Sequence, residues 1–152
     1  MTKNLVCYKR LPLWTAETLP KPFRQKHNTR KDVWAKLTIL KGQLQFTELT
    51  EDNEVVKEHI FTPESNIPFV EPQAWHRVAP LSDDLECFLK FYCEPKNYFS
   101  NKYDINPAHS EVVEALKTIK PCKTLDLGSG QGRNSLFLSK LGFEVTAVDN
   151  NI

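Results

Sequence analysis

Hydrophobic and polar positions alternate with period two along much of residues 1–95, a pattern that is typical of β-strands. The clearest runs are residues 33–40, 43–49, 55–61 and 85–93, of which the last is the most apolar. Residues 66–70 predict a further strand. Lys41-Gly42 separates the first two runs and predicts a hairpin between them, and residues 51–54 predict the next turn.

Proline is concentrated in the same region, which holds eight of the ten prolines. Because proline blocks helix interiors, residues 1–95 are expected to consist of strands and turns. Many short strands at regular spacing predict a small β-sandwich or barrel.

The pattern changes to helical spacing after Pro95. A helix capped by Asn106, with Pro107 in its first turn, is expected to run until Pro121. Residues 124–127 predict a short buried strand, residues 128–132 a glycine-rich turn, residues 134–141 a helix ended by Gly142, and residues 143–149 a second strand. This order is the opening βαβ unit of a doubly wound α/β fold.

Two domains follow from this change, one over residues 1–95 and one over residues 96–152. The second would contain only two parallel strands, whose unfinished edge exposes apolar backbone. The chain is therefore expected to be part of a longer protein.

Composition narrows the class of protein. Apolar residues make up 40% and charged residues 26% of 152 residues, which is a globular composition. The net charge of +1 does not favour nucleic acid, and no apolar run approaches the ~20 residues of a membrane span. The N-terminus has no signal-peptide core. Cys87 and Cys93 lie some 20 Å apart along one predicted strand, so reduced thiols in a cytoplasmic protein are expected.

The clearest chemistry lies in the glycine loop over residues 125–134. Gly128, Gly130 and Gly132 permit positive φ and close approach of a ligand, and Asp149 ends the next strand, where an acid can meet ribose hydroxyls. The glycine loop and this acid together predict a cofactor that contains a nucleoside. A dinucleotide loop would need glycine where Arg133 stands, so a nicotinamide oxidoreductase is disfavoured.

The spacing D-x-G-x-G-x-G resembles motif I of class I S-adenosylmethionine (SAM) methyltransferases. The resemblance implies that the loop backbone approaches SAM, that Asp126 orients its methionine moiety and that Asp149 holds its ribose. The cofactor-binding residues it implies beside the glycine loop are Lys102, Tyr103, Asp126, Gly128, Ser129, Gly130, Arg133, Asp149 and Asn150.

Residues 97–103 (NYFSNKY) and 109–115 (HSEVVEA), together with the glycine loop, resemble the tellurite-resistance (TehB-type) methyltransferase family. The resemblance implies methylation of tellurium and selenium oxyanions. Lys102 is a candidate partner for the cofactor carboxylate, or else a solvated lysine. Arg133 and His109 are candidate catalytic residues. A cation at a helix start is disfavoured without an anion, which makes an anionic partner for Arg133 worth testing; His109 is alternatively a capping or surface residue.

Residues 10–93 resemble the small cupin-like domain fused to some of these methyltransferases, on residues 27–34, Gly42 and residues 71–78. A cupin is a double-stranded β-barrel, in agreement with the strand pattern. No metal is expected; His27 and His76, with Glu71, are the candidates if one binds. The alternative is that both histidines form hydrogen bonds within the protein or line a pocket as polar groups.

The leading hypothesis is a cytoplasmic SAM-dependent methyltransferase that acts on small metalloid oxyanions. No nucleic-acid or membrane partner is expected, and a homo-oligomer is possible. The alternative is that the cupin-like part is a module for binding a small anion or metal, or for oligomerisation, without catalytic activity in this chain.

Overall fold

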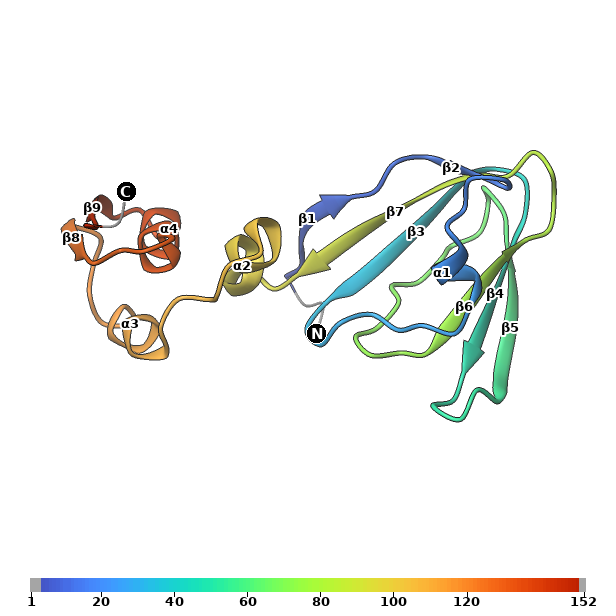
Figure 1. Ribbon diagram of the computed structural model, residues 1–152, viewed down its shortest axis with the longest axis horizontal. Helices are drawn as coiled ribbons and strands as arrows, with labels where there is room; N and C mark the ends of the chain where they lie inside the picture. The colour runs from blue at the N-terminus through green and yellow to red at the C-terminus, as the bar shows by residue number, and fades with distance from the viewer. Residues whose placement is uncertain (1–3, 151–152) are drawn as a thin grey trace. The chain divides into compact units, whose positions relative to one another are not determined.

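The computed structural model describes residues 4–150, which form two compact units that meet between Cys93 and Glu94. The first unit is built almost entirely of antiparallel strands, and the second combines helices with one parallel strand pair. Each is described by itself (Figure 1). The chain is therefore β-rich, with short helices.

The larger sheet of the first unit is organised around β7 (Glu86–Cys93). β3 (Trp34–Lys41) pairs with β7 over almost its full length. β1 (Val6–Arg10) and β2 (Trp14–Thr15) pair with successive parts of β7, so this most apolar strand lies inside the sheet (Figure 1). The predicted strands at 33–40 and 85–93 are confirmed.

The smaller sheet has β4 (Leu44–Leu49) at its centre. β5 (Val55–Phe61) pairs with one side of β4 and β6 (His76–Pro80) with the other, both antiparallel. The strands predicted at 43–49 and 55–61 and the turn between them are confirmed. β6 is absent from the sequence-based prediction.

The hairpin predicted at Lys41-Gly42 is wrong, because β3 and β4 belong to different sheets. Gly42 has φ +73°, and a Cβ there would lie 2.4 Å from Ser82 Oγ and 2.9 Å from Leu85 Cα. The backbone N–H of Gln43 also donates to Ser82 Oγ at 2.9 Å. Gly42 therefore forms a corner at which the chain leaves one sheet for the other, packed against the segment before β7.

Two further predictions for the first unit are wrong. Residues 66–70 form no strand, and their backbone pairs with β3 only at a single isolated bridge between Ala35 and Val70. Pro68 supplies no N–H for a strand ladder, which accounts for the irregular backbone. The chain also forms a one-turn helix, α1 (Lys21–Arg24), in which Pro22 occupies the first turn, where a missing N–H is tolerated.

The core of the first unit lies between the inward faces of its two sheets. Leu44, Leu85 and Cys87 are essentially inaccessible to solvent. Trp14, Phe46, Phe61 and Leu89 belong to the same buried cluster. Trp14 and Trp34 are both buried in this unit.

The second unit begins with η1 (Pro95–Asn97) and α2 (Tyr98–Tyr103), followed by α3 (Ser110–Ala115). β8 (Lys123–Leu127) and β9 (Glu144–Val148) pair in parallel, and α4 (Arg133–Lys140) connects them. The predicted strand, glycine turn, helix and strand are confirmed in that order. Gly142 has φ +90° just after α4, as expected for a helix end.

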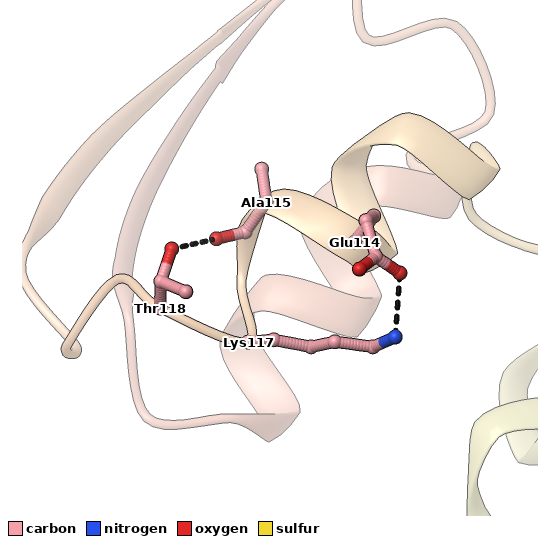
Figure 2. A network of polar contacts seen from close by, with 4 residues as sticks. All are labelled: Glu114, Ala115, Lys117 and Thr118. Atoms are coloured by element: carbon pink, nitrogen blue, oxygen red, sulfur yellow. Dashed lines mark hydrogen bonds and ion pairs between the residues drawn. The ribbon is translucent and has the colours of Figure 1, made fainter.

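α3 is shorter than predicted, with His109 rather than Asn106 at its N-cap. Figure 2 shows its C-terminal end, where Lys117 Nζ pairs with Glu114 Oε2 at 2.5 Å and Thr118 Oγ1 donates to the carbonyl oxygen of Ala115 at 3.2 Å. These contacts hold a turn after the helix proper.

The expectation that the strand at 124–127 is buried is also wrong. Leu125 and Leu127 are 57% and 72% exposed, and Val148 of β9 is 48% exposed. Among the described residues of this unit, Leu138 of α4 and Phe143 are the only buried hydrophobic ones. A two-stranded sheet with one connecting helix cannot cover its own apolar strands on both faces.

Candidate functional site

The glycine loop leaves β8 at Leu127 and enters α4 at Arg133. Gly128, Gly130 and Gly132 all have positive φ, at +65°, +54° and +83°. A Cβ at any of the three would meet no atom within 4 Å, so the space above the loop backbone is open. The N–H groups of Gly128 and Ser129 donate to the carbonyl oxygen of Val148 at 2.7 and 3.1 Å, which ties the loop to the end of β9.

Two carboxylates frame this loop. Asp149, directly after β9, accepts a hydrogen bond from the N–H of Gly130 at 2.7 Å through Oδ2. Asp126 in β8 accepts from Ser135 Oγ of α4 at 2.6 Å. Asn150 follows Asp149 and is exposed. The structure thus brings Asp126, the three glycines and Asp149 together at the carboxyl ends of two parallel strands, where nucleotides bind in such sheets.

Arg133 and His109 also lie together, beside the start of α4. Arg133 Nη1 donates to the carbonyl oxygen of Pro107 at 3.3 Å, and Nη2 donates to His109 Nε2. Arg133 therefore contacts two acceptors of the chain itself, and an anionic ligand as a further partner stays a prediction.

Lys102 and Tyr103 have a different set of neighbours. Lys102 Nζ donates to Tyr98 Oη at 2.8 Å, a bond that raises the pKa of Lys102. Tyr103 stacks on Phe99. Lys140, at the C-terminal end of α4, lies over the rings of Tyr98 and Phe99. These contacts lie near the far end of α4 from the glycine loop, about 12 Å along an eight-residue helix.

His27 and His76 are brought together in the first unit. Their backbones form an antiparallel bridge and their ring centroids lie 4.1 Å apart. Glu71 does not join them in a metal-binding group, and its Oε2 accepts a hydrogen bond from Trp34 Nε1 at 2.8 Å. Among residues 4–150, no three histidine, cysteine or acidic side chains gather closely enough to hold a metal ion.

Sequence reasoning missed residues that organise both regions. Asn134 Oδ1 accepts the backbone N–H of His109 at 2.9 Å, and Ser135 holds Asp126. His59 Nε2 contacts Glu48 Oε1 at 2.7 Å across β4 and β5. The position of Asn134 and Ser135 in the first turn after the loop was the available signal, since polar residues there face the strand ends.

Comparison with known families finds two family models that match the chain. A family model described as "TehB-like domain" matches residues 9–89, and one described as "Tellurite resistance protein TehB" matches residues 91–152. The first match alone covers more than half of the chain, so the chain belongs to the TehB family. The family resemblance inferred from the sequence is confirmed.

The chain is 62% identical over 151 residues to the "Probable S-adenosyl-L-methionine-dependent methyltransferase TehB" of Haemophilus influenzae strain Rd, covering 99% of this chain and 53% of that protein. The crystal structure of TehB from Haemophilus influenzae has a TM-score of 0.90, 62% identity and the same coverage. The chain therefore spans about half the length of the TehB relatives that it matches.

Two other similarities are narrower. Hemagglutinin 1 of Eikenella corrodens is 50% identical over 104 residues, covering 68% of this chain and 35% of that protein. A crystal structure of an Escherichia coli K12 protein has a TM-score of 0.56 at 19% identity, covering 62% of this chain and 96% of that one. At that identity the likeness concerns the fold alone.

Proposed function

We propose that this chain carries the cofactor-binding start of a SAM-dependent methyltransferase. The hydrogen bond from the N–H of Gly130 to Asp149 carries the proposal, because it holds a carboxylate over a glycine loop at the ends of two parallel strands. The open space above Gly128, Gly130 and Gly132 fits a ligand that approaches backbone, and any side chain there would fill it. The relative named as a SAM-dependent methyltransferase supports the same assignment.

We also propose a fold class for each of the two units. The first unit, with two antiparallel sheets around one core, is proposed to be the cupin-like barrel or sandwich domain. The second is proposed to be the opening of a Rossmann-like α/β domain, on its parallel β8–β9 pair joined by α4. The domain limits proposed are 1–95 and 96–152.

Within the site, Asp149 would hold the ribose hydroxyls and the loop N–H groups the remainder of the cofactor, with Asp126 and Asn150 beside them. When bound, SAM supplies a methyl group on a positively charged sulfur. Lys102 and Tyr103 join this site only if α2 closes toward the loop, because their present contacts are with aromatic residues of α2.

The substrate proposed is a small tellurium or selenium oxyanion. A lone pair on the metalloid forms the new bond to carbon while the bond from carbon to sulfur breaks and its electron pair stays on sulfur, so no strong base is needed. An oxyanion needs hydrogen-bond donors, and the guanidinium group of Arg133, next to His109, offers them beside the loop.

Calorimetric titration with S-adenosylhomocysteine tests the cofactor site in the 152-residue chain. We expect saturable one-to-one binding that Asp149→Ala weakens about tenfold, the equivalent of one charge-assisted hydrogen bond. Glu144→Ala removes a carboxylate from the opposite end of β9 and is expected to leave binding unchanged. Absence of binding by the unaltered chain, or equal binding by Asp149→Ala, would contradict the proposal.

Transfer of labelled methyl groups from SAM to selenite tests the substrate assignment. We expect Arg133→Ala to raise KM for selenite severalfold while leaving S-adenosylhomocysteine affinity within about twofold, and Arg133→Lys to recover part of the loss. Selenite turnover that is indifferent to Arg133 would remove this residue from the oxyanion site.

A cytoplasmic location is also proposed. Cys7, Cys87 and Cys122 are free thiols, as expected for a reducing compartment. No helix among the residues that the structure describes is long and apolar enough to cross a membrane.

A further inference from the structure

The first unit contains a cavity of about 260 Å³ between β4, β5 and the segment before β6. Much of its wall is aromatic, including Phe46, Phe61, Phe69 and Trp75. Four polar side chains also line it, namely Glu48, His59, Glu71 and His76. A mostly apolar cavity with a few convergent polar groups is the usual form of a small-molecule site.

His76 is the polar group whose hydrogen bonding is incomplete. His76 is only 6% exposed to solvent, and its Nδ1 lies 2.8 Å from the carbonyl oxygen of Ala74. A carbonyl only accepts, so Nδ1 carries the proton and neutral His76 has a lone pair on Nε2. Burial lowers the pKa of His76 to about 4, which keeps the ring neutral at physiological pH.

Nε2 of His76 is left to bond a ligand. No hydrogen bond to this atom is formed by the residues that the structure describes, and none of their fully buried side-chain nitrogens or oxygens lacks a partner. The atom is therefore not fully enclosed by protein, and His76 lines both this cavity and a neighbouring one that it shares with His27. Stacking on Phe46, with ring centroids 4.9 Å apart and planes 15° apart, holds the imidazole in place.

The other polar lining groups accept hydrogen bonds or are already paired. Glu71 accepts from Trp34 Nε1 at 2.8 Å, and Glu48 pairs with His59 at 2.7 Å. No lysine or arginine is among the described residues that line the cavity. Lys26 and Lys36 lie over the rings of Trp75 and Phe69, but each ammonium group donates to a backbone carbonyl.

An anionic ligand would find little compensation in such a cavity. Its negative charge would be desolvated among aromatic rings and would meet two carboxylates and a lone pair. A ligand with a hydrogen-bond donor at its polar end would instead complete the bonding of His76 and bury its apolar body.

We propose that this cavity binds a small organic molecule with an apolar, ring-sized body whose polar end, a hydroxyl or an amine, donates a hydrogen bond to Nε2 of His76. The cavity selects against carboxylates and other oxyanions. The proposal concerns the first unit and is independent of the methyltransferase assignment.

Four probes of similar shape test it at pH 7.5: benzyl alcohol, benzylamine, benzoate and toluene. Each is titrated into the 152-residue chain, with binding followed by NMR shifts of the Trp75 indole and of backbone amides along β4 and β6. We expect benzyl alcohol or benzylamine to bind at least about tenfold more tightly than benzoate, as one hydrogen bond against an uncompensated charge implies.

His76→Phe separates the hydrogen bond from the shape of the cavity, because phenylalanine keeps the stacked ring but has no lone pair. We expect this variant to bind toluene as well as the unaltered chain does, which also shows that it folds, and to lose about tenfold in benzyl alcohol affinity. His59→Phe is the matched control. It alters another imidazole of the same cavity, one whose Nε2 is already paired, and it should preserve the ratio of alcohol to toluene affinity.

Comparison of benzylamine with benzyl alcohol identifies the ligand group that donates the hydrogen bond to His76. Tighter binding of benzylamine, reduced by Glu48→Gln but not by the exposed Glu58→Gln, would assign an amine; equal or tighter binding of benzyl alcohol would assign a neutral hydroxyl. The proposal is overturned if benzoate binds most tightly, if His76→Phe leaves alcohol selectivity unchanged, or if none of the four probes binds up to its solubility.

Discussion

A single buried imidazole shows how strongly the environment of a residue determines its chemistry. His76 and His27 are packed ring to ring, and burial lowers the pKa of both. For His76 the proximity of His27 adds to the effect, while its bond to Ala74 opposes it. Each ring is therefore neutral near pH 7, and its Nδ1–H donates a hydrogen bond to a backbone carbonyl oxygen, that of Gln25 for His27 and that of Ala74 for His76.

The stability of the first unit should therefore depend on pH below neutrality. The pKa of His76 is about 4 in the folded chain against 6.5 in the unfolded chain, so the unfolded chain binds more protons between these values. Stability from this residue is complete above pH 6.5 and is lost as the pH falls toward 4, by on the order of 3 kcal/mol. Urea unfolding at pH 7.5, 6, 5 and 4.5 measures it. His76→Phe should flatten the profile; an equally steep profile in that variant would assign the loss to other groups.

Gly42 is a second position where one residue matters. Gly42→Ala combines positive φ with a Cβ only 2.9 Å from the Cα of Leu85, so we expect it to lower the unfolding free energy by about 2–4 kcal/mol. Gly142→Ala is the control. It has a similar φ but meets only Pro121 at 3.8 Å, and should cost about 1 kcal/mol in its own unit. Denaturant titrations followed by NMR in each unit compare the two; equal costs would mean that the corner at Gly42 can relax.

At the scale of elements, pairing partners are determined by packing as well as by turns. β3 and β4 are neighbours in sequence but do not pair with each other; β3 pairs with β7, and β4 pairs with β5 and β6. In the second unit, Asn134 and Arg133 join the start of α4 to the segment that begins α3.

Asn134→Ala should loosen α3 without disturbing the strands. The change removes the acceptor for the N–H of His109, a partly solvated bond with a net contribution of about 1 kcal/mol. We expect faster amide hydrogen exchange at the start of α3 and unchanged exchange in β8 and β9. Asn134→Asp keeps an acceptor oxygen and should behave like the unaltered chain. Uniformly faster exchange throughout the unit would instead indicate that Asn134 supports the whole βαβ unit.

At the scale of the whole molecule, the division between Cys93 and Glu94 predicts two separately unfolding parts. Leu44→Ala removes a fully buried side chain of the first unit and should cost about 2–5 kcal/mol there. Amide exchange from β3 to β7 should accelerate, whereas exchange in β8, α4 and β9 should not. Leu40→Ala, at a residue that is 47% exposed, should change neither. Accelerated exchange in both units would show that they unfold together.

Elements that depend on residues close together in the sequence were predicted correctly, whereas features that depend on residues far apart in the sequence were not. The strands at 55–61 and 85–93, the helix after the glycine loop and the positive-φ glycines were all predictable, because alternation, helical spacing and glycine conformation are local properties. The strand at 66–70 failed because its apolar residues pack beside β3 without a ladder. The buried strand at 124–127 failed because apolar composition does not reveal how many elements cover a strand.

The family, the βαβ order and the glycine loop with an acid after the next strand are evident from the amino-acid sequence, since these depend on short spacings and recognisable motifs. The folded structure was needed to show that Asp149 accepts a hydrogen bond from Gly130 and that His27 contacts His76. It also shows that aromatic and polar side chains from β4, β5 and residues 67–76 line one cavity. These contacts join residues many positions apart, and their existence depends on which strands pair and how closely their side chains pack, which no local pattern records.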